Sequence, residues 1–285
     1  MTATSRPLRS VLYIPGSKPR ALEKAKSLQV DAIIFDLEDA VAPDEKDAAR
    51  QTLADALAEG GYGARLKIVR INGLETDWGS RDAAAAAEMG ADAILLPKVD
   101  GPENLDALAK ITKHIPLWAM METPRGMIAA PAIAAHRLCE GLVMGTNDLA
   151  KELNTRFRAD RLPLMAGLGL CLLAAKSEGI AIIDGVFNAF KDEEGLREEC
   201  AQGRDMGFDG KTLIHPAQVD IANAAFAPSE AEVELAERQI AAYDAAIAQG
   251  QAVAVVDGRI VENLHVATAR ETLAKRDAIE ALNAE

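Results

Sequence analysis

Residues 33–39 read IIFDLED, a short hydrophobic run that ends in a cluster of acids. Five further runs have the same design: IVRIN at 68–72, ILLPK at 94–98, AMMETP at 119–124, VMGTND at 143–148 and TLIHP at 212–216. Charged and polar side chains placed just past a buried strand are typical of a parallel α/β barrel, whose catalytic groups gather at one rim. The pattern therefore predicts an enzyme.

The order of segments along the chain predicts how many barrel units there are. Strands rich in Val, Ile and Leu alternate with helical stretches such as 44–59, 102–113 and 164–178, which indicates a buried parallel sheet. The expected strands begin near Val11, Ala32, Leu66, Ala93, Leu117, Leu142, Ala181 and Thr212. Eight such units fit a closed (β/α)8 barrel of the α/β class better than an open sheet.

Two regions fall outside this repeat. Residues 149–163 read as a loop with a short helix on the active rim. After the last unit, a helix at 229–249, a hairpin turn at Asp257-Gly258 and a helix at about 264–282 are expected. We therefore expect a barrel domain at 1–227 and a C-terminal helical extension at 228–285, which caps its own barrel or swaps onto a neighbouring subunit.

Composition excludes several classes of partner. The chain has 285 residues, 49% of them hydrophobic, which is enough to fill one large core. Its net charge of −13 argues against a general nucleic-acid or anionic-membrane surface. The N-terminus has no apolar signal core, and no apolar run reaches the roughly 20 residues of a membrane helix. We expect a soluble, cytoplasmic protein without nucleic-acid or membrane partners.

Two acids at neighbouring strand ends suggest a metal site. Glu122 and Asp148 follow the fifth and sixth strands. Adjacent strands lie about 4.8 Å apart, so both carboxylates can converge on one ion. Two carboxylates with water and substrate oxygens suit Mg²⁺, for which Mn²⁺ is a substitute. The alternative is that each acid caps the helix that follows it.

Arg70 stands near the end of the third strand, where a buried guanidinium requires an acidic partner or a ligand. We expect it to polarise a substrate carbonyl, with Glu38 holding its orientation. A purely structural pair of Arg70 and Glu38 is the alternative.

The loop after the first strand, residues 13–20, carries cations at a helix start, where a phosphate is favoured. An ordinary helix start with surface lysines explains the same residues. His215, at the end of the eighth strand, suits either a ligand contact or a structural role.

With these residues in place, the chain resembles the citrate lyase β-subunit and malyl-CoA lyase family of acyl-CoA lyases, within the HpcH/HpaI aldolase superfamily, from Arg9 to about Ala281. The segments RSVLYIPGSKPRALEKA, IIFDLEDAVAPDEK, VRIN, LPKV, ETPRG, GTNDLA and GKTLIHPAQ occur in the family's order. The resemblance implies a TIM barrel, a homotrimer or hexamer, and Mg²⁺ that organises a 3-hydroxyacyl thioester of coenzyme A for cleavage.

The resemblance also implies roles for individual residues. Glu122 and Asp148 would bind Mg²⁺, and Arg70 would contact the substrate carbonyl. The implied coenzyme A site is lined by Tyr13, Ile14, Lys18, Lys24, Asn147, Ile214 and His215.

One position departs from the family pattern. Where many relatives carry an Asp in G-x-M-I-D-x-P, donated from a neighbouring subunit as acid or base, this chain has Glu262 within GRIVENL. The longer side chain moves the carboxylate by up to roughly 1.5 Å, which can matter to proton transfer. The leading expectation is carbon–carbon lysis of a malyl-CoA-like thioester. Hydrolysis by a malyl-CoA thioesterase, as among close relatives, stands close behind, and a noncatalytic or acyl-carrier-dependent subunit is the third alternative.

Overall fold

The structure is a computed structural model that describes residues 6–284. The chain divides into two compact units, Leu8–Phe226 and a second one that contains residues 227–284.

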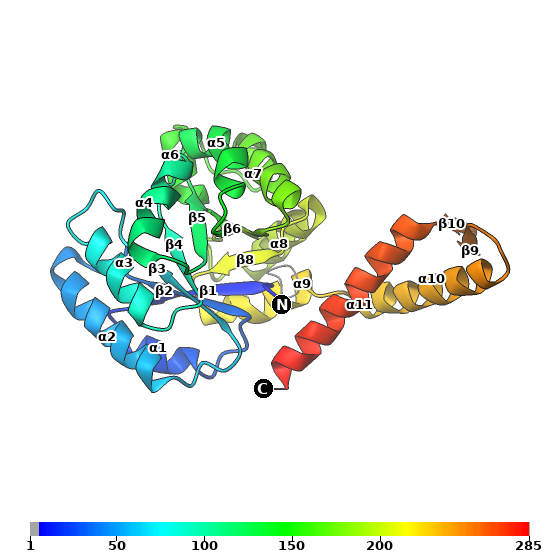
Figure 1. Ribbon diagram of the computed structural model, residues 1–285, viewed down its shortest axis with the longest axis horizontal. Coiled ribbons are helices and arrows are strands. Elements are labelled where there is room, and N and C mark those ends of the chain that lie inside the picture. The colour runs from blue at the N-terminus through cyan, green and yellow to red at the C-terminus, as the bar shows by residue number, and fades with distance from the viewer. Residues whose placement is uncertain (1–5, 285) are drawn as a thin grey trace. The chain divides into compact units, whose positions relative to one another are not determined.

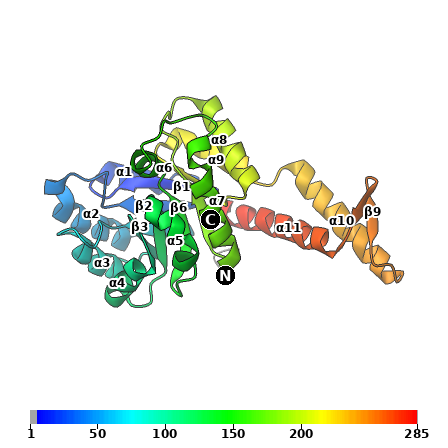
Figure 2. The same cartoon turned by 90° about the horizontal axis from the view of Figure 1, so that it is seen from above.

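The first unit is a closed barrel of eight parallel strands in chain order, with helices around its outside (Figures 1 and 2). Its strands are β1 (Ser10–Pro15), β2 (Ala32–Asp36), β3 (Leu66–Arg70), β4 (Ala93–Leu96), β5 (Leu117–Met121), β6 (Cys139–Met144), β7 (Ala181–Asp184) and β8 (Gly210–Leu213). The predicted barrel is confirmed. Two strand starts are earlier than expected, because β6 begins at Cys139 rather than near Leu142 and β8 at Gly210 rather than Thr212.

The helical segments of this unit follow the strands in turn. They are α1 (Pro19–Ala25), η2 (Pro43–Glu45), α2 (Lys46–Glu59), α3 (Gly79–Glu88), α4 (Pro102–Thr112), α5 (Pro124–Ala134), α6 (Thr146–Glu152), η3 (Leu162–Leu164), α7 (Met165–Glu178), α8 (Glu193–Met206), η4 (Pro216–Gln218) and α9 (Val219–Phe226). The short helix expected within 149–163 is α6, which starts earlier, at Thr146.

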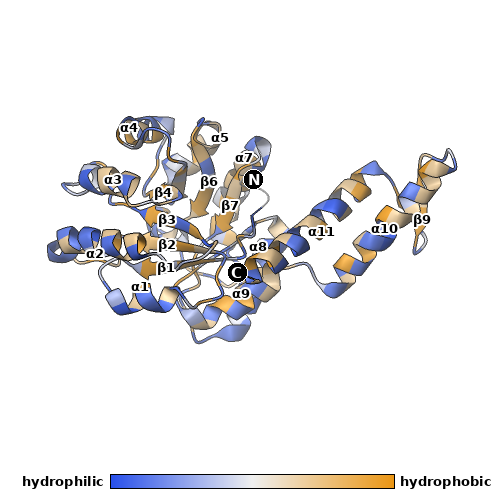
Figure 3. Ribbon diagram, turned by 60° about the horizontal axis from the view of Figure 1, so that its bottom comes forward, coloured by the Kyte–Doolittle hydropathy of each residue, from blue (hydrophilic) through white to orange (hydrophobic). Residues whose placement is uncertain are grey.

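Two hydrophobic layers hold the barrel together. Consecutive strand residues point to opposite faces of a sheet. One set, which includes Ile34, Ile68 and Val143 and no helix residue, fills the barrel interior. The other set packs against the helices, and much of the barrel sheet accordingly has hydrophobic colours in Figure 3. Trp118 belongs to the interior, and Gly141 makes room for it, since a Cβ there would lie 2.5 Å from the indole ring.

The second unit is built from the long helices α10 (Glu230–Ala248) and α11 (Asn263–Asn283), which pack along each other (Figure 1). Between them, β9 (Ala254–Val256) and β10 (Arg259–Val261) form an antiparallel hairpin. Asp257 and Gly258 have φ of 49° and 75°, as a two-residue hairpin turn of the predicted kind requires. This unit has a small hydrophobic core of its own, formed by Ala246, Ala254, Val261 and Val266.

Across residues 6–284, no helix is both long enough and apolar enough to cross a membrane.

Candidate active site

Arg70, the last residue of β3, is anchored by acids at the carboxyl end of β2. Its Nε and Nη2 donate to the two oxygens of Asp36 at 2.7 and 2.6 Å, and its Nη1 lies 2.9 Å from Glu38 Oε2. The guanidinium carbon lies 4.9 Å from the ring centre of Tyr13, which adds a cation–π contact. The guanidinium is thus held in one orientation before any ligand arrives.

Asp36 is the partner that sequence reasoning missed. The barrel register pairs Asp36 directly with Arg70 across β2 and β3, and its side chain is only 1% exposed. The signal was present in IIFDLED, where Asp36 is the last residue of a buried strand. The expected contact with Glu38 exists as well, so Arg70 has two carboxylate partners rather than one.

Glu38 lies on a loop whose main chain is held by two neighbouring side chains. Lys46 Nζ donates to the main-chain oxygens of Leu37 and Glu38 at 2.9 and 2.7 Å, and Asn72 Nδ2 donates to the oxygen of Leu37 at 2.8 Å. Burial raises the pKa of Glu38 to about 7, against the lowering effect of Arg70. A pKa in this range suits a general base that works at neutral pH.

Glu122 and Asp148 face the same part of the rim. Glu122 is 2% exposed, and its Oε1 accepts a hydrogen bond of 2.8 Å from the main-chain N–H of Lys98. Burial, with a smaller contribution from the nearby carboxylate of Asp148, raises the pKa of Glu122 to about 7, against the lowering effect of the N–H of Lys98. Two acids so close to each other favour a cation between them.

The alternative role of helix cap does not hold for Glu122. Helix α5 is capped by Thr123, whose Oγ1 accepts a hydrogen bond of 3.0 Å from the N–H of Gly126. Asp148 lies within the first turn of α6, and that helix has no side-chain cap. Capping therefore leaves the burial of Glu122 unexplained.

Gly145 shapes the space around Glu122. A Cβ at this position would lie 2.4 Å from Glu122 Cβ and 2.5 Å from its Oε2. The end of β6 can approach the carboxylate this closely only because residue 145 has no side chain.

The donor set fits a hard cation. Within residues 6–284 there is no cluster of three or more His, Cys, Asp or Glu that could hold a metal. A cation at Glu122 and Asp148 would therefore complete its shell with water or substrate oxygens, which suits Mg²⁺ rather than Zn²⁺.

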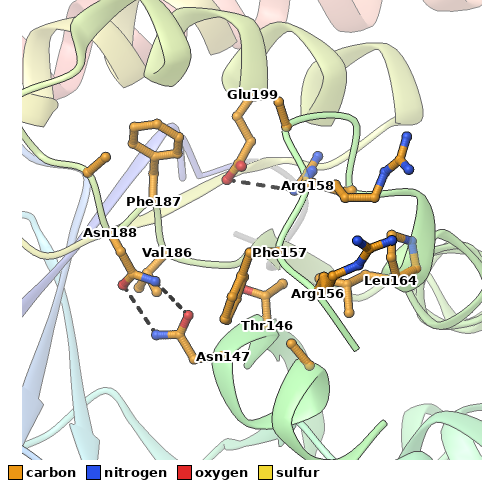
Figure 4. A pocket seen from close by; sticks show the side chains of 15 residues that line it. Thr146, Asn147, Arg156, Phe157, Arg158, Leu164, Val186, Phe187, Asn188 and Glu199 are labelled. Carbon is orange, nitrogen blue, oxygen red and sulfur yellow. Dashed lines mark hydrogen bonds and ion pairs between the residues drawn. The ribbon is translucent and has the colours of Figure 1, made fainter. Parts of the chain in front are cut away.

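A cavity of about 390 Å³ opens beside the start of α6 (Figure 4). Its lining includes the side chains of Arg156, Arg158 and Phe157. At one edge Asn147 and Asn188 exchange two hydrogen bonds of 3.2 and 2.7 Å, drawn as dashed lines in Figure 4. The cavity does not include Arg70 or Glu122, so it adjoins the rim site through Asn147 without containing the paired acids.

A buried ionic cluster that the sequence did not reveal fixes the ends of β7 and β8. Lys211, which is fully buried, donates to Glu199 and to the main-chain oxygen of Gly185, each at 2.6 Å. Arg161 donates to both oxygens of Asp184 at 2.7 and 2.8 Å. Only the folded barrel brings these charges together, since they come from four separate segments.

Known protein families match this arrangement over most of the chain. Residues 9–216 match the model described as HpcH/HpaI aldolase/citrate lyase, and residues 164–277 match a C-C bond lyase of the TIM-barrel fold. The chain belongs to the HpcH/HpaI aldolase/citrate lyase family.

Members of the family that have been named differ in their reactions. The (3S)-malyl-CoA thioesterase of Cereibacter sphaeroides is 64% identical over 284 residues, which cover 100% of both chains. The citrate lyase subunit beta of Escherichia coli is 33% identical, over 96% of this chain and 94% of its own. The resemblance inferred from the sequence is thus confirmed at family level.

A solved structure of this family contains the expected ligands. CitE from Mycobacterium tuberculosis, crystallised with magnesium, acetoacetate and coenzyme A, is 30% identical to this chain, with a TM-score of 0.80. The match covers 95% of this chain and 98% of the CitE chain. This match supports both the barrel fold and the assignment of the chain to the family.

The residues predicted to line a coenzyme A site are spread over the rim. Lys18 precedes α1 and pairs with Glu45 at 3.3 Å, and Lys24 is exposed on the same helix. Helix α1 has only seven residues and begins with proline, so a phosphate there would depend mainly on the lysine charges. The side chain of Ile14 packs in the outer hydrophobic layer, which turns it away from a ligand in the barrel mouth.

The remaining predicted residues lie at the ends of β6 and β8 and in the second unit. Asn147 and His215 are exposed, and Ile214 is 42% exposed. His215 stacks on Phe190 with ring centres 4.7 Å apart, and its Nδ1 accepts a hydrogen bond from the N–H of Ala217. Glu262 is exposed and precedes α11.

Proposed function

We propose that this protein is a Mg²⁺-dependent thioesterase that hydrolyses a malyl-CoA-like thioester to malate and free coenzyme A. The observation that carries this proposal is the 64% identity, over the full length of both chains, to a protein named (3S)-malyl-CoA thioesterase. It reverses the order expected from the sequence, in which carbon–carbon lysis led and hydrolysis followed.

The paired acids and the anchored arginine supply the chemistry that hydrolysis needs. When bound, Mg²⁺ would neutralise Glu122 and Asp148 and polarise oxygens of the acyl group. Arg70, oriented by Asp36, donates hydrogen bonds to the thioester carbonyl and stabilises the negative charge that develops on its oxygen.

Glu38 is our candidate for the base. It accepts a proton from the attacking water, whose oxygen forms a bond to the carbonyl carbon. The carbon–sulfur bond then breaks, and coenzyme A leaves as a thiolate that takes up a proton. A pKa near 7 allows Glu38 both to accept the proton from water and to return it to the thiolate.

Carbon–carbon lysis is the second candidate, favoured by the family of lyases to which the chain belongs. It would use the same arginine to stabilise the enolate of acetyl-CoA, and it needs an acid or base such as Glu262. A subunit that depends on an acyl carrier is the third candidate, favoured by the relatives named citrate lyase subunit beta.

Product analysis in H₂¹⁸O separates the three. The purified protein is incubated with Mg²⁺ and (3S)-malyl-CoA, and products are identified by mass spectrometry. Hydrolysis yields free coenzyme A and malate with one ¹⁸O in a carboxylate. Glyoxylate with acetyl-CoA would establish the lyase, and absence of turnover on the free thioester would favour the carrier-dependent subunit.

A further inference from the structure

Lys98 lies beside Glu122 and Glu38 at the rim in an unusual backbone conformation. It follows β4 and has a φ of 51°, in the left-handed region that lysine rarely adopts. This conformation turns its main-chain N–H toward Glu122, 2.8 Å from Oε1. Backbone of this kind is concentrated at functional sites, where surrounding contacts hold it.

The side chain of Lys98 has hydrogen-bonding capacity to spare. Its nearest carboxylate oxygen, Oε1 of Glu38, lies 3.7 Å from Nζ, which is beyond hydrogen-bond distance, and the side chain is 53% exposed. Its ammonium group makes no hydrogen bond to any residue in 6–284, so its three donors remain available. Arg70, by contrast, has committed Nε and Nη2 to Asp36.

The charges around Lys98 are mostly negative. Glu38 Oε1 lies 3.7 Å from its Nζ, and Glu122 accepts a hydrogen bond from its main-chain N–H. A lysine ammonium group is charged at neutral pH, and this one lies beside the acids of the rim site. With Mg²⁺ bound at Glu122 and Asp148, the carboxylates of Glu38 and Asp39 would still repel a substrate carboxylate, and a cation with free donors offsets them.

We propose that Lys98 is a specificity-determining residue whose ammonium group binds the carboxylate of the acyl group. The identity of that acyl group rests on the proposed function. Glu122 and Asp148 would act on the same end of the substrate, and Arg70 on its thioester carbonyl. Acyl groups that lack a carboxylate would gain nothing from Lys98.

The variants are chosen to change the charge and leave the backbone in place. Lys98→Asn removes the ammonium group, but it keeps the N–H that holds Glu122, and asparagine tolerates the left-handed conformation. Lys98→Arg retains a positive charge. Lys113→Asn is the matched control, because Lys113 also has a positive φ, 63°, but is exposed at the end of α4.

Two binding measurements test this proposal without requiring catalytic turnover. In titrations of Mn²⁺ monitored by electron paramagnetic resonance, Lys98→Asn should bind the ion about 3- to 10-fold more tightly, because a neighbouring positive charge is gone. In calorimetry with Mg²⁺ present, the same variant should bind (S)-malate about tenfold more weakly, since a charge-assisted hydrogen bond is lost. Its affinity for free coenzyme A, which lacks the acyl carboxylate that Lys98 is proposed to bind, should change less than about twofold.

The opposite signs for metal and malate distinguish this role from a structural one. If Lys98→Asn weakened Mn²⁺ and malate together, or weakened malate and coenzyme A equally, the assignment would be overturned. Lys98→Arg should retain malate affinity, and Lys113→Asn should match the wild type in every measurement. A wild-type protein that binds Mn²⁺ and malate but does not turn over malyl-CoA would count against the proposed function while leaving the role of Lys98 intact.

Discussion

At the scale of single residues, the rim site is a set of charges that the fold has oriented before any ligand arrives. Arg70 and Asp36 are both buried and joined by two short hydrogen bonds. A buried pair of this kind is costly to break, because the remaining charge would be left without a partner. Its value to the enzyme is therefore orientation rather than net stability.

The metal assignment is tested at Glu122 and Asp148. Glu122→Gln and Asp148→Asn should each weaken Mn²⁺ binding by at least about 100-fold and abolish turnover, because each removes an anionic ligand from a hard cation. Circular dichroism should show an intact fold. Turnover equal to the wild type at limiting Mg²⁺, in either variant, would reject the assignment.

At the scale of elements, the segment after β5 places a helix cap, Thr123, next to a candidate metal ligand, Glu122. Thr123 caps α5 and also donates to Asp100 Oδ1 at 2.5 Å, whereas Glu122 turns into the rim. Substitution of Thr123 is therefore expected to lower stability, whereas substitution of Glu122 is expected to weaken metal binding.

Thr123→Ala should lower the free energy of unfolding by about 1 to 2 kcal/mol, through loss of the cap of α5. Denaturant unfolding would measure this loss, and Mn²⁺ affinity should stay close to that of the wild type. Thr123→Ser keeps the hydroxyl and is the matched control. A loss of metal affinity in Thr123→Ala without a loss of stability would show that the cap also serves the site.

At the scale of the whole molecule, the open question is whether the site draws a residue from a second copy of the chain. Glu262 precedes α11 in the second unit, and the family resemblance assigns this position an acid or base donated between subunits. Catalysis would then require an oligomer.

Mixing two inactive variants tests this idea. Glu262→Ala and Glu122→Gln, combined under conditions that allow subunits to exchange, should recover part of the activity, since some sites would draw both intact residues from different chains. Exchange is verified with differently labelled subunits. A fully active Glu262→Ala protein, or no recovery after verified exchange, would leave Glu262 as an ordinary surface carboxylate.

Much of this protein could be read from the sequence because its signals are local. The strands, the helices, the Asp257-Gly258 hairpin and the rim positions of Arg70, Glu122 and Asp148 follow from periodicity and from which residue comes just after a buried run. A resemblance spread over many ordered segments then identified the family.

Tertiary structure alone decided which side chains meet. The pairing of Asp36 with Arg70 depends on the register of β2 and β3, and that of Asp184 with Lys211 depends on the register of β7 and β8, with Arg161 added from the segment between α6 and η3. The place of Lys98 between Glu38 and Glu122 depends on a left-handed backbone conformation that the neighbouring sequence does not predict. The physical reason is that register, closure and backbone conformation are set by packing over the whole barrel, whereas the periodicity of a segment reports only its own buried face.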